Sequence, residues 1–181
     1  FPEHATDETS AKAVAATLFQ SFVPGCDWAA FDAGTIEPNA LADQLAARTP
    51  YPRAHIAALI AAIAQHLVPM SDTVALIESV RAAGHRLGLL SNMPRPYADH
   101  LEATHACFGH FEHLTWSGRV GHIKPQREIF DHVRVAMGIE DASQLVFIDD
   151  HAGNIEAARS LGWQAIHFTS ARACADELSR L

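Results

Sequence analysis

The chain has 181 residues, a hydrophobic content of 49% and a formal net charge of −8 at pH 7. This length suits one α/β domain with a small addition, while 13 scattered basic residues argue against a nucleic-acid partner, which needs clustered Lys and Arg. No apolar run approaches the roughly 20 residues of a membrane span. Three widely spaced cysteines favour a cytoplasmic protein with free thiols.

The first part of the chain is predicted to be helical. Alanine-rich segments predict helices over residues 8–22, 38–47 and 53–66, with breaks at prolines and glycines between them. A proline and a candidate capping serine set a boundary near residue 70. We therefore expect residues 1–70 to form a small helical cap.

From residue 71 onward, helices alternate with short apolar strands. The strands are predicted over residues 87–90, 113–116, 145–148 and 165–168. The helices are predicted over residues 72–83, 95–104, 126–137, 152–161 and 171–181. This alternation is typical of a doubly wound, Rossmann-like parallel sheet with right-handed crossovers, so residues 71–181 are expected to form an α/β core.

Polar side chains stand at the ends of these elements. Ser91 and Asn92 end one apolar run, and Asp149 and Asp150 end another. Two adjacent carboxylates repel each other, so a cation or a shared proton is the natural reason to keep both. Lys124 precedes a proline and a helix expected from about residue 126, and a proline in the first turn would fix the approach of the lysine. Together these groups bind an anion and a divalent metal, the needs of phosphoryl transfer.

Each group also has an ordinary structural explanation. Ser91 and Asn92 could cap the following helix, and Lys124 could be a solvated surface charge. Asp149 and Asp150 could cap a helix N-terminus and suit its dipole. The functional interpretation depends on the three signals occurring together and in order. Of the 12 histidines, His100, His105, His110 and His113 lie close together in sequence, but their spacings match no compact ligand motif for a metal.

The three motifs resemble those of the haloacid dehalogenase superfamily of hydrolases, in particular its phosphatases with a small helical cap. The resemblance implies that Ser91 and Lys124 are catalytic. Ser91 would hydrogen-bond the transferring phosphoryl group, and Lys124 would neutralise the nucleophile and the phosphate. Asn92 stands where the family often keeps an asparagine, and we expect it to bind substrate together with these two residues.

The same resemblance implies a magnesium site. Asp150 would be a direct ligand of Mg²⁺, Asp149 would act through water, and Asn154 would support the acidic pair. The expected activity is that of a magnesium-dependent phosphatase, which hydrolyses a small phosphorylated metabolite through an aspartyl-phosphate intermediate. Many members of the family form dimers, so a homodimer is compatible with the resemblance, which does not specify it.

One motif of the family is absent. The family's nucleophile is an aspartate at the end of the first strand, within Asp-x-Asp or Asp-x-Gly. Residues 31–36, with the sequence FDAGTI, resemble that motif, but too few residues separate them from Ser91 to hold the cap. The preceding WAAF would also be a poor central strand. We interpret residues 31–45 as a turn and helix of the cap, and the chain as given is expected to be inactive.

The missing strand is expected upstream of Phe1. In this family it is central, and each backbone group left buried and unpaired beside it would cost about 1–3 kcal/mol, too much for a domain stable by about 5–15 kcal/mol. The parent polypeptide is expected to carry roughly 10–25 further residues with an apolar strand ending in aspartate. The alternative is a catalytically inactive module that binds a phosphate or a partner. A 2-haloacid dehalogenase is less favoured, since that branch uses no metal and lacks the acidic pair.

Overall fold

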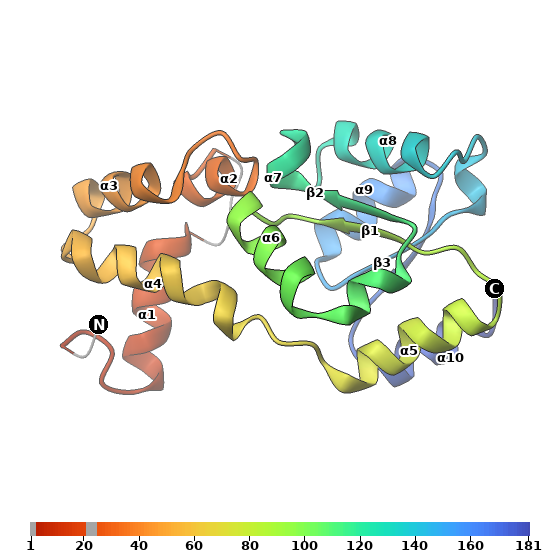
Figure 1. Ribbon diagram of the computed structural model, residues 1–181, viewed down its shortest axis with the longest axis horizontal. Helices are drawn as coiled ribbons and strands as arrows, with labels where there is room; N and C mark the ends of the chain where they lie inside the picture. Colours follow the sequence, from red (N-terminus) through yellow and green to blue (C-terminus); the bar gives the residue numbers. More distant parts are fainter. Residues whose placement is uncertain (1–2, 21–24) are drawn as a thin grey trace.

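The computed structural model describes residues 3–20 and 25–181. Helices fill one end of the molecule and the strands lie in the other (Figure 1). The helical end contains α1 (Glu8–Phe19), α2 (Asp27–Asp32), α3 (Pro38–Arg48) and α4 (Arg53–His66). Three of these were predicted. The short α2 was missed, because six residues are too few to show a helical period.

The boundaries of these helices follow from local chemistry. Asp7 caps α1 by accepting a hydrogen bond from the Ser10 amide at 2.8 Å, and Ser10 returns the contact in a capping box. The helix ends at Phe19, earlier than predicted, because Gln20 takes the left-handed conformation (φ 48°). The predicted helical end at Phe22 lies outside the described residues. Pro38 occupies the first turn of α3, where its missing amide hydrogen costs nothing.

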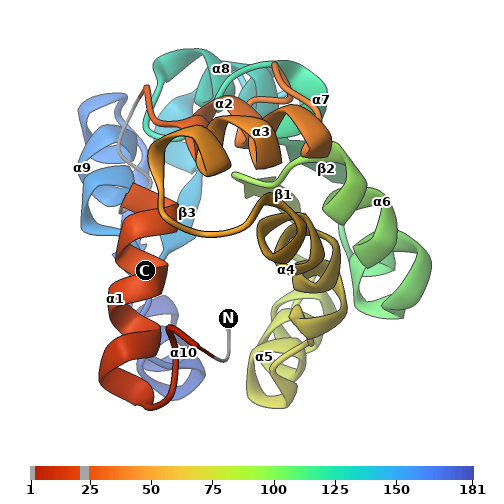
Figure 2. The same cartoon turned by 90° about the vertical axis from the view of Figure 1, so that its left-hand side faces the viewer.

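The helical end packs around its own hydrophobic core. Figure 2, which looks onto this end, shows α2 and α3 above α1 and α4. Leu18, Leu41 and Ile56 are fully buried there. The core continues across the expected boundary at residue 70, because the ring of Tyr97 packs edge-on against Phe31, with 5.5 Å between their centroids. The division into residues 1–70 and 71–181 stays a prediction.

The remainder of the chain confirms the predicted α/β class. Its strands are β1 (Gly88–Ser91), β2 (His113–Trp116), β3 (Val146–Asp149) and β4 (Gln164–His167). Its helices are α5 (Ser71–Ala82), α6 (Arg95–Thr104), α7 (Ser117–Val120), α8 (Arg127–Ala136), α9 (Ala152–Ser160) and α10 (Ala171–Leu178). Two short 3₁₀ helices, Ala106–His110 and Ala142–Gln144, precede β2 and β3.

The strands form two parallel pairs. In one pair β1 lies beside β2, with Ser91 opposite Trp116, and in the other β3 lies beside β4, with Asp149 opposite His167. Within residues 3–20 and 25–181, no backbone pairing joins β1 to β3. Each of these two strands therefore keeps one edge without a partner strand in the described part of the chain.

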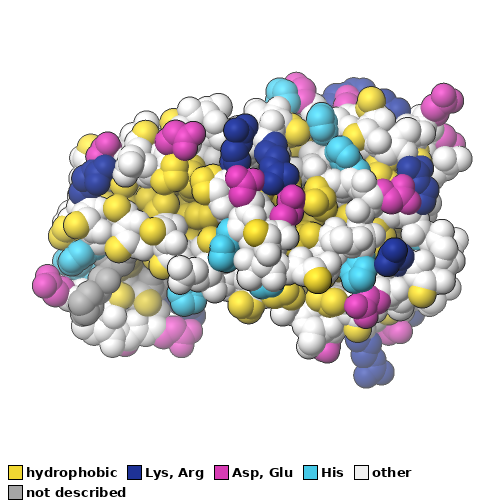
Figure 3. Space-filling view, viewed as in Figure 1, with side chains coloured by type: hydrophobic (Ala, Val, Ile, Leu, Met, Phe, Trp, Pro, Cys, Tyr) yellow, Lys and Arg dark blue, Asp and Glu magenta, His cyan; other side chains and the backbone are white. Residues whose placement is uncertain are grey.

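Several apolar groups around these open edges are incompletely covered. No residue of β1 or of α5 is buried, and Ile148 of β3 is 40% exposed. The helix α5 packs beside α10, away from the strands (Figure 1). Val68 and Met70, which precede α5, are 70% and 65% exposed, and Figure 3 shows hydrophobic side chains at the surface between the helical end and α5.

No single helix among the described residues has the length and hydropathy of a membrane span, although the pair formed by α4 and α5, bent by 49°, passes that test of length and composition together.

Candidate functional site

A buried ion pair connects the two strand pairs. Lys124, from the loop between α7 and α8, donates to the Asp149 carboxylate, with 2.6 Å between Nζ and Oδ2. The same ammonium donates to the carbonyl oxygen of Leu90 in β1 at 3.1 Å. The two charged side chains are 11% and 5% exposed. A charged hydrogen bond of this geometry is short and strong, and it fixes the ends of β1 and β3 relative to each other.

Asp149 receives further hydrogen bonds at its other oxygen. Its Oδ1 accepts from the backbone amide of His151 at 2.8 Å and from the Asn154 side chain at 2.9 Å. Burial by itself raises the pKa of Asp149, but the charge and hydrogen bond of Lys124, with the bonds from Asn154 and His151, outweigh it and hold the pKa below its usual value. The carboxylate is therefore ionised at neutral pH. Asn154 contacts Asp149 directly, and its support of a metal-binding pair, which the resemblance implies, stays a prediction.

Asp150 has a different environment from its neighbour. Its side chain is exposed, and no hydrogen bond or ion pair of its carboxylate is found within the described residues. Its backbone carbonyl lies 2.9 Å from Nε2 of His167, which holds the main chain in place. With Asp149 engaged by Lys124, the Asp150 carboxylate is the group of the pair that is open to a cation.

The donor chemistry suits magnesium in part. Carboxylate oxygens are the protein ligands that Mg²⁺ prefers, and Mg²⁺ is often held by one or two carboxylates together with water and substrate phosphate. No cluster of three or more His, Cys, Asp or Glu side chains with metal-binding geometry occurs in the described part of the chain. Among the described residues, Asp149 and Asp150 thus offer two carboxylates to a cation, fewer ligands than a complete metal site needs.

The position of Lys124 is set by Asn92. The Asn92 side chain donates to the Lys124 carbonyl at 3.0 Å and accepts from the Lys124 amide at 2.7 Å. Both ends of this side chain are thereby used to position the lysine, and its expected contact with substrate stays a prediction. The helix expected from about residue 126 is observed as α8, which begins at Arg127 after the N-cap residue Gln126. Pro125 lies just before its first turn, and the Lys124–Pro125 bond is cis.

Ser91 stands at the end of β1, next to Leu90, the residue that Lys124 contacts. Its side chain is half-buried, and its hydroxyl has no recorded hydrogen-bond partner in residues 3–20 and 25–181. The hydroxyl is therefore free to donate to an anion at this edge of the strands. The structure thus brings Ser91, Lys124, Asp149 and Asp150 to the carboxyl ends of β1 and β3, the usual location of α/β sites.

The sequence interpretation missed Ser117, which lies beside this edge and contacts Asp32 of the rejected FDAGTI motif. Ser117 is fully buried and donates to the carbonyl of Asp32 at 2.6 Å, while it accepts from the Met93 amide at 2.7 Å. Ser117 directly follows a predicted strand, as Ser91 does, and this placement was the available signal. Asp32 ends α2, so residues 31–36 form no strand. Burial raises the pKa of its carboxyl to about 7.

A hollow of about 110 Å³ lies at the junction between the turn after α2 and the start of α6. Gly34, Arg95 and Gly118 are among its lining residues. None of the predicted site residues lines it, so the ion pair and the acidic pair form a separate feature.

Comparison with known proteins agrees with this geometry. Residues 7–162 match the family of haloacid dehalogenase-like hydrolases. The chain is 28% identical over 154 residues to the sesquiterpene phosphatase astK of Aspergillus oryzae, and the match covers 85% of this chain and 78% of that protein.

Two solved structures share the fold. One is the enzyme bt-2542 of Bacteroides thetaiotaomicron, a member of the same family in complex with magnesium and inorganic phosphate (TM-score 0.64, 22% identity, covering 86% of this chain and 81% of that one). The other is a predicted HAD-like hydrolase of Porphyromonas gingivalis (TM-score 0.68, 20% identity, covering 100% and 91%). The family match spans more than half of the chain and includes β1, Lys124 and the acidic pair, and the chain therefore belongs to the haloacid dehalogenase-like hydrolases.

Proposed function

We propose that the parent protein is a magnesium-dependent phosphatase that hydrolyses a small phosphomonoester through an aspartyl-phosphate intermediate. The observation that carries this proposal is the Lys124–Asp149 ion pair at 2.6 Å, which joins the ends of β1 and β3 and leaves the Asp150 carboxylate open. The similarity to the sesquiterpene phosphatase astK supports hydrolysis of a phosphate ester as the reaction. The magnesium and phosphate found in bt-2542 support the metal and the anion.

The proposed nucleophile is the aspartate of a strand that precedes Phe1 and lies between β1 and β3. Both strands have an open edge toward this position in the described part of the chain. The incomplete burial of β1 and of Ile148 in β3 supports the same placement, because the strands of a parallel sheet are normally covered on both faces. A strand parallel to these neighbours would end at the same edge as Ser91 and Asp149.

The residues of this chain would bind and orient the phosphoryl group. The Ser91 hydroxyl would donate to a non-bridging phosphoryl oxygen, and the Lys124 ammonium would stabilise the negative charge on the phosphate and the attacking carboxylate. The attack forms an oxygen–phosphorus bond and releases the alcohol, and water then hydrolyses the aspartyl-phosphate to inorganic phosphate. Asp150 would hold a magnesium ion directly, and Asp149 would act through water. The ion would further neutralise the charge of the phosphate.

The test uses the full-length natural polypeptide with p-nitrophenyl phosphate over a magnesium titration. The Asp150→Asn variant is expected to lose magnesium-dependent hydrolysis by roughly 100-fold or more, with an unchanged circular dichroism spectrum. Asp176→Asn, at an exposed position of α10, is the matched control and is expected to keep wild-type rates. Near wild-type turnover by Asp150→Asn would refute the role of Asp150.

Two other outcomes would change the assignment. Release of chloride from 2-chloropropionate would favour a 2-haloacid dehalogenase. Binding of phosphate without turnover by the full-length polypeptide would favour an inactive binding module.

The three cysteines, Cys26, Cys107 and Cys174, are unpaired, which supports a cytoplasmic location.

A further inference from the structure

One buried hydroxyl connects the helical end to the candidate site. The Ser117 side chain is 0% exposed and uses both its hydrogen-bonding functions: it donates to the carbonyl of Asp32 in α2 and accepts from the amide of Met93. The two distances are 2.6 Å and 2.7 Å. Met93 follows Ser91 and Asn92 directly, so a single side chain joins the helical end to the segment that carries the predicted phosphate-binding hydroxyl.

The backbones around Ser117 are in close contact. A Cβ atom added to Gly34, in the turn after α2, would lie 2.4 Å from the carbonyl oxygen of Gly118. A Cβ atom added to Gly118 would lie 2.5 Å from the backbone nitrogen of Arg95 and 2.9 Å from the carbonyl oxygen of Met93. Three chain segments therefore meet at a distance that only glycine allows, and small displacements of one segment are passed to the others.

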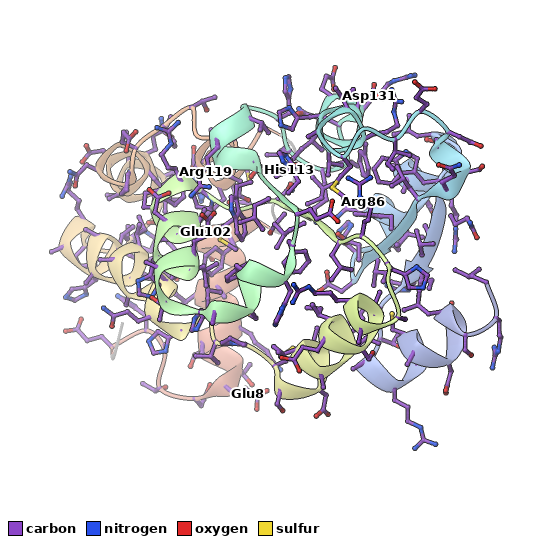
Figure 4. The ribbon with its side chains drawn as sticks, turned by 45° about the vertical axis from the view of Figure 1, so that its right-hand side comes forward. Glu8, Arg86, Glu102, His113, Arg119 and Asp131 are labelled. Carbon is purple, nitrogen blue, oxygen red and sulfur yellow. The ribbon has the colours of Figure 1, made fainter. Side chains whose placement is uncertain are left out.

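The segment that carries Ser117 is also held from its outer side. Arg119 of α7 forms ion pairs with Asp99 at 2.6 Å and with Glu102 at 2.7 Å, both on α6. Figure 4 shows Arg119 and Glu102 beside each other. These contacts are partly exposed and each stabilises the fold only modestly, but together they fix α7 against α6.

The contacts continue from Met93 to the ion pair. Gly118 donates from its amide to the Met93 carbonyl at 3.1 Å, and Asn92 makes its two hydrogen bonds with the backbone of Lys124. Lys124 in turn contacts Asp149. Hydrogen bonds, joined by the covalent step from Met93 to Asn92 and by the Lys124 side chain, thus connect the Asp32 carbonyl in the helical end to the carboxylate at the end of β3.

We propose that Ser117 is a positioning residue that aligns Ser91, Asn92 and Lys124 with the helical end, so that the helical end and the phosphate-binding groups hold one relative geometry. The inference rests on the proposed phosphatase function for its kinetic consequence. A displacement of about 1 Å of groups that bind the reacting phosphoryl group is expected to cost roughly 100-fold in rate.

The kinetic test compares Ser117→Ala with the wild type in the full-length natural polypeptide, with p-nitrophenyl phosphate and magnesium. We expect kcat to fall by roughly 10- to 100-fold with a smaller change in KM, because alignment is needed most in the transition state. Thr49→Ala is the matched control, since Thr49 also donates a partly buried hydroxyl to a carbonyl, that of Leu45 at 2.7 Å, far along the chain from the site. It is expected to lower thermal stability without lowering kcat.

A second variant covers the case in which Ser117→Ala does not fold. Ser117→Cys keeps a small side chain with a weak donor and acceptor, and its kcat is expected to lie between those of the wild type and Ser117→Ala. A folded alanine or cysteine variant that keeps wild-type kcat would overturn the inference.

Amide hydrogen exchange separates this inference from the proposed function. In the variants, faster exchange of the Met93 amide is expected to extend to the Lys124 amide, which bonds to Asn92. If the wild type hydrolyses no phosphomonoester but exchange at Lys124 still rises, the proposed function fails and the coupling stands. If exchange rises only at Met93, the coupling is wrong, whatever the activity.

Discussion

Replacement of Asp32 by asparagine is expected to stabilise the fold, and to do so more at high pH than in acid. The Asp32 carboxyl is half-buried and has no recorded hydrogen-bond partner among the described residues. Burial raises its pKa from the ordinary 3.8 to about 7. The unfolded chain therefore ionises this group first, so stability falls as the pH rises from about 4 to about 7 and the full cost is present above the folded pKa.

The magnitude follows from the two pKa values. At about 1.4 kcal/mol per pH unit, the interval between 3.8 and about 7 corresponds to about 4 kcal/mol at most. Solvent screens part of this cost at a half-buried position. We therefore expect Asp32→Asn to raise the free energy of unfolding by about 2–3 kcal/mol near pH 8 and by about 1 kcal/mol near pH 5.

Urea unfolding of the two proteins at both pH values measures this difference. Comparison with the wild type at each pH removes the contributions of the other titrating groups, including Asp149, whose lowered pKa gives the opposite dependence. Asp176→Asn, at an exposed position, is the control and should change stability little at either pH. Equal stabilisation at both pH values, or a loss of stability near pH 8, would refute the attribution to a desolvated carboxyl.

Two further predictions concern buried contacts. Lys124→Met leaves the Asp149 carboxylate buried without its counter-ion and should lower the free energy of unfolding by about 3–5 kcal/mol near pH 7. This loss should shrink as the pH falls below 3.8, because the stabilisation of Asp149 is present above that value and is lost in acid; a pH-independent loss in urea unfolding would contradict the assignment. Gly34→Ala places a methyl group 2.4 Å from a backbone oxygen, whereas Gly84→Ala meets nothing within 4 Å at a similarly positive φ. The first variant should be less stable than the second by about 1–3 kcal/mol in thermal unfolding, and equal stability would refute the close contact between the turn after α2 and α7.

Much of the fold followed from local patterns. The four strands were predicted because each is a short apolar run bounded by turn residues, and the helices α3, α4 and α6 follow from periodicity and proline positions. The start of α8 was predicted to within one residue. The short α2 was not predicted, because six residues show no helical period and its position depends on packing against other helices.

The charged residues of the candidate site could be predicted from the sequence, whereas the neutral residue Ser117 could not. Asp149 stands out in sequence because a carboxylate at the end of an apolar strand is costly to bury without a partner, and Lys124, just before a predicted helix, supplies the opposite charge. Ser117 does not stand out, because serine is common and its role depends on Asp32 and Met93, which lie 85 and 24 residues away along the chain. The pKa of Asp32 likewise depends on helices that pack around it, which no local sequence pattern records.

The most direct test of the account is chemical trapping of the phosphoryl-enzyme. The full-length natural polypeptide would be mixed with a ³²P-labelled phosphomonoester and magnesium, quenched in acid, digested and mapped by mass spectrometry. The account predicts label on an aspartate at the end of a strand that precedes Phe1, and none on residues of this chain. Label on Asp32 or any other residue of the chain, or turnover without a trapped aspartyl-phosphate, would contradict the proposal that the nucleophile lies between β1 and β3.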